Sequence, residues 1–196
     1  MIVGITGGIA TGKSTVSQLF RKAGWQVIDA DQVAHQVRDY NPQVRRALIE
    51  RFGAQLFATG KLDTKLLGSM VFDDHQALAD LNALLQPLIR QEIKRQVQAA
   101  VERPLVLEIQ LLVEQHYQSL CDVVVVAATS KRRQLQRLVQ RDHLNTHEAQ
   151  SRIAAQLPLT AKIKQADWVI DNNSTYRKTV LQTAWLIDYL SQKKGV

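Results

Sequence analysis

The residues with the clearest chemical potential form a short glycine-rich stretch near the start of the chain. It reads GGIATGKS and fits the pattern G-x-x-x-x-G-K-[ST] of the phosphate-binding P-loop. Glycines let successive backbone N–H groups curl toward phosphate oxygens, and the helix that follows adds the positive end of its dipole. The residues predicted to bind a nucleoside triphosphate are Gly7, Gly8, Ala10, Thr11, Gly12, Lys13, Ser14 and Thr15. Among them, Lys13 is expected at the β- and γ-phosphates and Ser14 at Mg²⁺.

Carboxylates follow two other apolar runs. Val27-Ile28-Asp29-Ala30-Asp31 places two of them where a strand ends, and ligands of α/β sheets bind at that edge. Asp31, one step past the strand, is predicted to accept the proton of an attacking hydroxyl. Asp29 can equally cap the next helix. Glu108, at the end of a later strand, either holds Mg²⁺ through water or has no metal role.

The positive charge of the chain is concentrated in one region. The chain carries 25 Lys and Arg against 18 Asp and Glu, a net charge of +7, and residues 128–168 hold eight basic against three acidic residues. Arg133, Arg137 and Arg141 are four apart and would line one helix face, either as a solvated surface or as a phosphate clamp. Aromatic residues make up only 6% of the chain, so no base-stacking platform for nucleic acid is visible.

Other sequence features narrow the class of nucleotide-binding protein. The chain has no guanine-reading N-K-x-D pattern, and the apolar run 123–127 ends without the carboxylate of a motor ATPase. A P-loop, a carboxylate at the strand edge and arginines that can close over phosphates together favour a small-molecule kinase. Two alternatives remain: a kinase for another nucleotide or nucleoside, and a nucleotide-gated switch that binds nucleic acid or protein.

Apolar runs and helical periodicity alternate along the 196 residues. This alternation predicts a parallel α/β sheet with helices on both faces. The predicted strands are Ile2–Thr6, Gln26–Asp29, Leu105–Ile109, Val123–Ala127 and Trp168–Ile170, and the predicted helices cover about 13–23, 31–39, 42–52, 64–71, 75–101, 130–141, 146–156 and 175–192. The long gap between the second and third strands predicts a helical insertion, and the polar segment 142–164 a smaller one.

Composition also bears on the compartment. A single cysteine and no apolar run of membrane-spanning length favour a cytoplasmic protein without disulfides or a membrane partner. His143 and His147 would ligate a metal only if both lay on one helix, and no third ligand is near them in the sequence.

The ordered motifs resemble those of the dephospho-CoA kinase family. They are ITGGIATGKSTVS, VIDADQVAHQV, GKLDTKLLGSMVF, LNALLQPLI, LLVE, QLQRLVQRD and RIAAQLPLTAKIKQADWVIDNN, and they span about residues 2–173. The resemblance implies ATP-dependent phosphorylation of the ribose 3′-hydroxyl of dephospho-CoA, with Mg²⁺, to give coenzyme A and ADP. It also implies a three-layer P-loop kinase fold with a five-stranded parallel sheet: a core of about 1–59, 102–141 and 165–196, a helical CoA-binding insertion of about 60–101, and a lid of about 142–164. We expect a monomer with dephospho-CoA and ATP as its small-molecule partners, and no nucleic acid.

The resemblance also implies roles for single residues. Asp31 takes the position of the catalytic aspartate, and Lys13 and Ser14 the P-loop roles. Arg141 takes the lid position that contacts phosphate, with Arg137 as its helper. Asn172 takes a position at the adenine pocket. The departures from the family pattern are Gln86 in place of a histidine before Pro87, Glu108 in place of an aspartate, and Gln110 in place of a proline.

Overall fold

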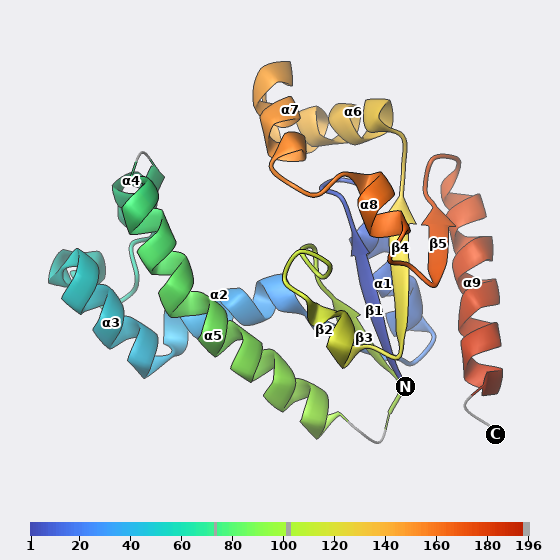
Figure 1. The fold of residues 1–196 in the computed structure, drawn as a ribbon, viewed down its shortest axis with the longest axis horizontal. Helices are drawn as coiled ribbons and strands as arrows, with labels where there is room; N and C mark the ends of the chain where they lie inside the picture. Colours follow the sequence, from blue (N-terminus) through green and yellow to red (C-terminus); the bar gives the residue numbers. More distant parts are fainter. Residues whose placement is uncertain (73, 101–102, 194–196) are drawn as a thin grey trace. The chain divides into compact units, whose positions relative to one another are not determined.

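Five short apolar runs of the chain form one parallel sheet, which Figure 1 shows. The computed structural model describes residues 1–72, 74–100 and 103–193. Its strands are β1 (Ile2–Gly7), β2 (Gln26–Asp29), β3 (Leu105–Glu108), β4 (Val123–Ala128) and β5 (Trp168–Asp171), in the order β2-β3-β1-β4-β5. Every neighbouring pair is parallel. The predicted α/β fold with a five-stranded parallel sheet is confirmed. Strands of a parallel sheet covered on both faces are continuous apolar runs rather than alternating apolar and polar residues. This pattern allowed the strands to be predicted from the sequence.

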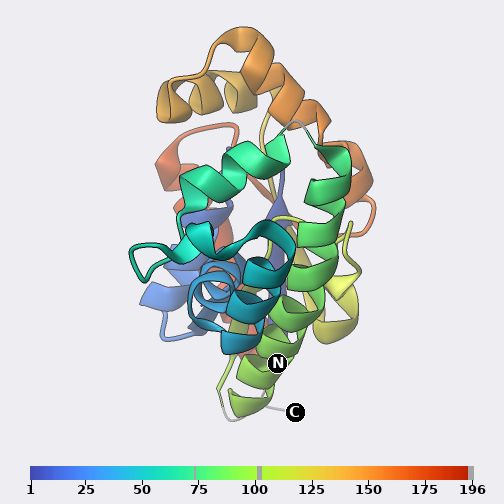
Figure 2. The ribbon, with the colours of Figure 1, turned by 90° about the vertical axis from the view of Figure 1, so that its left-hand side faces the viewer.

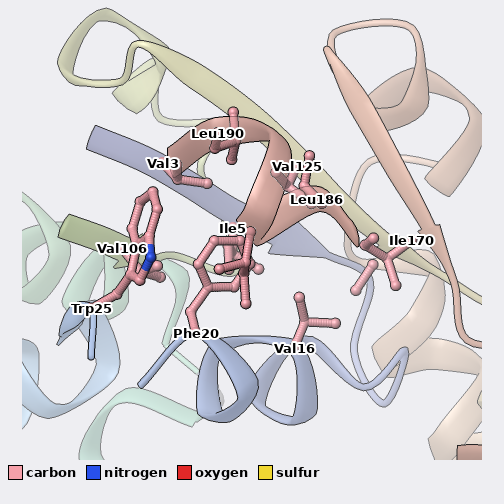
Figure 3. Close-up of a cluster of buried hydrophobic side chains, with 12 residues drawn as sticks. Val3, Ile5, Val16, Phe20, Trp25, Val106, Val125, Ile170, Leu186 and Leu190 are labelled. Atoms are coloured by element: carbon pink, nitrogen blue, oxygen red, sulfur yellow. The ribbon is translucent and has the colours of Figure 1, made fainter. Parts of the chain in front are cut away.

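Two helices, α1 (Lys13–Lys22) and α9 (Tyr176–Lys193), cover one face of the sheet. Each presents apolar residues four positions apart, which lie on one side of a helix. The side chains of this core point toward one another from both helices and from four of the strands: Val3, Ile5, Val16, Phe20, Val106, Val125, Ile170, Leu186 and Leu190 (Figure 3). Trp25 meets Phe20 edge to face, with ring centroids 5.0 Å apart. This core fixes the start of α1 against the end of β1, where the P-loop lies.

The segment between β3 and β4 packs on the other face of the sheet. It includes the 3₁₀ helix η2 (Tyr117–Leu120). At Gly4 of β1, a Cβ atom would lie 2.6 Å from Cys121 Sγ and 2.7 Å from Leu112 Cδ1, so this face has no room for a side chain there. Burial, with the charge of Asp122, raises the pKa of the Cys121 thiol to about 12. Cys121 is therefore a packing residue rather than a nucleophile.

The chain between β4 and β5 forms three helices of the sheet unit. They are α6 (Lys131–Asp142), α7 (Thr146–Ala154) and α8 (Leu159–Ile163), of which the last was not predicted. Helix α7 ends at Ala154, two residues before the predicted end at residue 156, in keeping with Pro158 shortly after it, and the side chain of Gln156 binds the P-loop backbone. None of the helices in the described ranges is both long and apolar enough to cross a membrane.

Residues 30–99 form a separate helical unit, seen face-on in Figure 2. It contains α2 (Ala30–Tyr40), α3 (Pro42–Phe52), the 3₁₀ helix η1 (Ala54–Phe57), α4 (Thr64–Phe72) and α5 (His75–Ala99). The unit begins at Ala30, whereas the predicted insertion begins near residue 60, because α2 and α3 bury apolar residues against α5 rather than against the sheet. Residues 101 and 102, where the insertion is predicted to end, and residue 196 lie outside the described ranges.

The core contact of Phe20 gives a stability prediction. Its side chain is fully buried beneath the sheet, so Phe20→Ala should lower the free energy of unfolding by about 3–5 kcal/mol. Phe72, whose side chain is exposed, is the matched control, and Phe72→Ala should change that free energy by less than about 0.5 kcal/mol. Urea unfolding followed by circular dichroism measures both, and equal effects of the two changes would contradict this packing.

Candidate active site

The P-loop leaves β1 at Gly7 and enters α1 at Lys13 in a conformation with two left-handed residues. Ala10 has φ 58° and Gly12 has φ 92°. The loop closes on itself through Thr11, whose N–H and hydroxyl both donate to the carbonyl of Gly8, at 3.2 and 2.8 Å. Glycine adopts such a backbone without strain, whereas Ala10 does so at a cost of about 1–2 kcal/mol. The strain at Ala10 indicates that the surrounding contacts determine the shape of the loop.

Lys13 and Ser14 meet one carboxylate at the end of the neighbouring strand. Lys13 Nζ donates to Glu108 Oε1 at 2.7 Å, and Ser14 Oγ donates to the same oxygen at 2.9 Å. The side chains of the ion pair are only 10% and 5% exposed. Burial acts most strongly on the Glu108 pKa and raises it, but the charge of Lys13 and hydrogen bonds from Lys13, Ser14 and Ser17 together hold this pKa below its ordinary 4.5. Glu108 therefore stays ionised at neutral pH and loses its charge only in acid below that value.

Asn172, immediately after β5, supports the P-loop through the backbone of Thr11. Its Nδ2 donates to the carbonyl of Thr11 at 2.8 Å, and its Oδ1 accepts from the hydroxyl of Thr179 at 2.9 Å. Arg137 NH2 donates to the Asn172 carbonyl at 3.0 Å, and NH1 lies 3.5 Å from the Thr11 carbonyl. Burial, and then the charge of Arg133, lower the pKa of Arg137. Asn172 and Arg137, both predicted to contact nucleotide, thus hold the P-loop itself.

Two glutamines bind the backbone N–H and the backbone carbonyl of one loop residue, Ile9. Gln134 Nε2 donates to the carbonyl of Ile9 at 2.8 Å, and Gln156 Oε1 accepts from the N–H of Ile9 at 2.8 Å. They come from α6 and from the turn between α7 and α8. Sequence reasoning missed both, and Thr179 as well. Two signals were available: both glutamines lie inside motifs of the family pattern, and Gln134 lies four residues before Leu138 and so shares its helix face.

The end of β2 lies at the same edge of the sheet as Glu108. Asp29 is the register partner of Glu108 across the two strands, and Glu108 is in turn the partner of Ile5 in β1. Asp31 is the second residue of α2, with an exposed side chain, two positions beyond that edge along the chain. It belongs to the unit 30–99, whereas Lys13 belongs to the sheet unit.

The three arginines predicted on one face of α6 have different partners. Arg133 NH1 donates to the Ser174 carbonyl at 2.8 Å, and Arg137 binds the P-loop support described above. Arg141, at the end of α6, pairs with its neighbour Asp142 at 2.7 Å, and Arg152 of α7 reaches the other oxygen of that carboxylate at 3.4 Å. The hydrogen bond from Arg141 is the main cause that lowers the Asp142 pKa. Asp142 thus neutralises charge on two arginines of this segment.

The structure also places the two histidines considered as metal ligands and two residues that depart from the family pattern. His143 caps the end of α6 and His147 lies in α7, so the two do not share a helix. No cluster of three or more His, Cys, Asp or Glu suited to a metal occurs in the described part of the chain. Gln86 is an exposed residue of α5. Gln110 accepts hydrogen bonds through its backbone carbonyl, a group that the family's usual proline would also provide.

A matched pair of glycines tests the support of the loop. At Gly12 an added Cβ would overlap Asn172 Nδ2, whereas at Gly24, with φ 88°, no atom lies within 4 Å. Gly12→Ala should weaken binding of a fluorescent ADP analogue by about 10- to 100-fold, since Asn172 must give up its hydrogen bonds. Gly24→Ala carries the same backbone strain and should leave nucleotide affinity unchanged. Equal affinity of the two variants would show that the Asn172 contact does not matter.

Comparison with known proteins identifies the family of the chain. A family model described as dephospho-CoA kinase matches residues 1–178. A dephospho-CoA kinase from Latilactobacillus sakei is 42% identical over 197 residues, covering 99% of this chain and 98% of that protein. A crystal structure from Thermus thermophilus matches with a TM-score of 0.81 at 30% identity, covering 98% and 97% of the two chains. The structure of a dephospho-CoA kinase from Campylobacter jejuni matches with a TM-score of 0.69 at 28% identity, covering 96% of each. The chain, a P-loop kinase in fold, belongs to the dephospho-CoA kinase family.

Proposed function

We propose that the chain transfers the γ-phosphoryl group of ATP to the ribose 3′-hydroxyl of dephospho-CoA, with Asp31 as the base that orients and deprotonates this hydroxyl. The observation that carries the proposal is the convergence of Lys13 and Ser14 on Glu108, beside the strand end that Asp31 follows. Phosphoryl transfer needs positioned cations at the phosphates and a carboxylate at the acceptor. These residues supply both kinds of group.

Lys13 is proposed to exchange its partner when ATP binds. In the structure its ammonium is bound to Glu108 at 2.7 Å, and both side chains are almost completely buried. A triphosphate carries more charge than one carboxylate and offers several oxygens, so the ammonium can turn to the β- and γ-phosphates. Until then, Glu108 keeps the buried ammonium neutralised.

The residues around Glu108 fit Mg²⁺. The hydroxyl of Ser14 and the carboxylate of Glu108 are hard oxygen donors whose oxygens lie 2.9 Å apart, and Mg²⁺ in kinases takes few protein ligands besides phosphates and water. When bound, the ion supplies charge neutralisation between the β- and γ-phosphates. Ser14 is the proposed direct ligand, and Glu108 is proposed to act through water.

Arg141 is proposed to stabilise the transferring phosphoryl group, together with a lid that covers about residues 142–164. The helical insertion of about residues 60–101 is proposed to bind dephospho-CoA. The arginine has an exposed side chain at the end of α6, and its partner is an Asp142 carboxylate shared with Arg152. An exposed ion pair of this kind contributes little and exchanges readily. We further propose a cytoplasmic monomer.

Turnover separates this function from its alternatives. Purified protein with ATP, Mg²⁺ and dephospho-CoA should release ADP and give a product whose mass and fragmentation match 3′-phosphorylation. Other nucleosides and nucleotides serve as the comparison acceptors. Release of ADP with one of these and none with dephospho-CoA would overturn the proposal.

The base has its own test. Asp31→Asn should lower kcat by about 10²–10⁴-fold, because the amide cannot take the proton of the attacking hydroxyl. Asp39, on the same helix and paired with Arg38, is the matched control, and Asp39→Asn should keep kcat within about threefold of the wild type. A kcat for Asp31→Asn in that same range would exclude the base role.

Removal of the metal tests Glu108. Because its negative charge attracts Mg²⁺ and repels free phosphate, the ratio of ATP affinity with Mg²⁺ to ATP affinity in EDTA should fall by about tenfold in Glu108→Gln. Calorimetry with and without Mg²⁺ gives both affinities. An unchanged ratio would leave Glu108 as a partner of Lys13 alone.

A further inference from the structure

Lys162 of α8 is a fully buried lysine, with 0% of its side chain exposed. Its ammonium lies 2.7 Å from the carbonyl of Gln110, 2.8 Å from Glu114 Oε1 and 3.4 Å from the carbonyl of Gly7. A buried ammonium is stable only when its charge and its three N–H donors are matched by partners. These three oxygens meet that requirement, so the charge is held in one place.

Two of the three acceptors, the carbonyls of Gly7 and Gln110, lie where strands of the site end. Gly7 is both the last residue of β1 and the first glycine of the P-loop pattern. The Gln110 carbonyl, just past β3, also accepts the hydroxyl of Thr6 at 3.0 Å. Lys162 therefore joins the end of β1, which leads to Lys13, to the exit of β3, which carries Glu108.

The same segment touches the P-loop a second time. Gln156 accepts from the Ile9 N–H at 2.8 Å, and Leu157 N donates to Glu114 Oε1 at 3.3 Å. The other carboxylate oxygen of Glu114 is buried, and the described residues offer it no hydrogen-bond partner. Glu114 therefore depends on Lys162 and Leu157, and the segment 156–163 contacts the nucleotide loop at Gln156 and at Lys162.

We propose that Lys162 is a positioning residue for nucleotide binding. It holds the Gly7 and Gln110 carbonyls in the arrangement that aligns the P-loop with Glu108, and it acts through these groups rather than by touching phosphate. The inference rests on the proposed use of ATP at this loop. The contacts of Lys162 and that of Gln156 connect the C-terminal part of the predicted lid with the P-loop and the exit of β3.

The test compares Lys162→Met with Lys164→Met, an exposed lysine just past the same helix. Lys162→Met should raise the Kd for ADP and the KM for ATP by about tenfold or more, because charged donors to two carbonyls are lost. The KM for dephospho-CoA at saturating ATP should stay within about threefold. Lys164→Met should leave the Kd for ADP and both KM values unchanged. A purely structural role of Lys162 would instead lower kcat by reducing the folded fraction, with both KM values unchanged.

A double variant separates folding from positioning. Lys162→Met leaves the Glu114 carboxylate buried without its counter-ion, whereas Lys162→Met with Glu114→Leu removes both charges. The double variant should melt at a higher temperature than the single variant, yet its Kd for ADP should stay about tenfold or more above the wild type, because Gly7 and Gln110 still lack a donor. Recovery of wild-type ADP affinity in the double variant, or wild-type affinity in Lys162→Met, would overturn the proposal.

Direct ADP binding keeps the two proposals apart. Wild-type protein that binds ADP but does not phosphorylate dephospho-CoA would contradict the proposed acceptor and leave the role of Lys162 standing. Wild-type turnover of dephospho-CoA together with unchanged ADP affinity in Lys162→Met would contradict the role of Lys162 alone.

Discussion

The site depends on hydrogen bonds that fix the peptide groups of the P-loop from outside. A glycine-rich loop that includes a left-handed alanine does not keep one shape by itself, since fixing each residue costs about 1–2 kcal/mol of conformational entropy. Gln134, Gln156 and Asn172 lie 125 to 161 residues further along the chain than the loop carbonyls and N–H they bind. The parallel sheet brings these distant segments to the loop, so its shape depends on the fold of the whole sheet unit.

The basic surplus of the chain has several uses in the structure. Lys13 and Lys162 are buried and form ion pairs with Glu108 and Glu114. Arg137 donates hydrogen bonds to backbone carbonyls. At the end of α6 and in α7, Arg141 and Arg152 form ion pairs that are accessible to solvent, with Asp142 between them. Positive charge at this place suits polyanionic substrates, and the buried part of the surplus serves to hold the site together.

The sheet and most helices were predictable because their patterns are local. Apolar strands, the P-loop and the carboxylate-bearing strand end each occupy a few consecutive residues, and the order of motifs identified the family. The limits of the helical unit were not predictable in the same way. Helices α2 and α3 show ordinary amphipathic stripes, and nothing in such a stripe says whether its partner is α5 or the sheet. That choice depends on the whole packed unit.

The sequence by itself determined the chemistry class: a phosphate-binding loop, a carboxylate after the next strand along the chain and a surplus of cations. Only the tertiary structure decided which side chains serve the loop. Asn172 and Arg137 hold the P-loop backbone, and Gln134, Gln156 and Lys162, to which the sequence assigned no role, hold it as well. A motif records which residue types a reaction needs, whereas a supporting hydrogen bond requires only a donor or acceptor at the right point in space. Many side chains can supply that group, so their positions become evident only when the chain is folded.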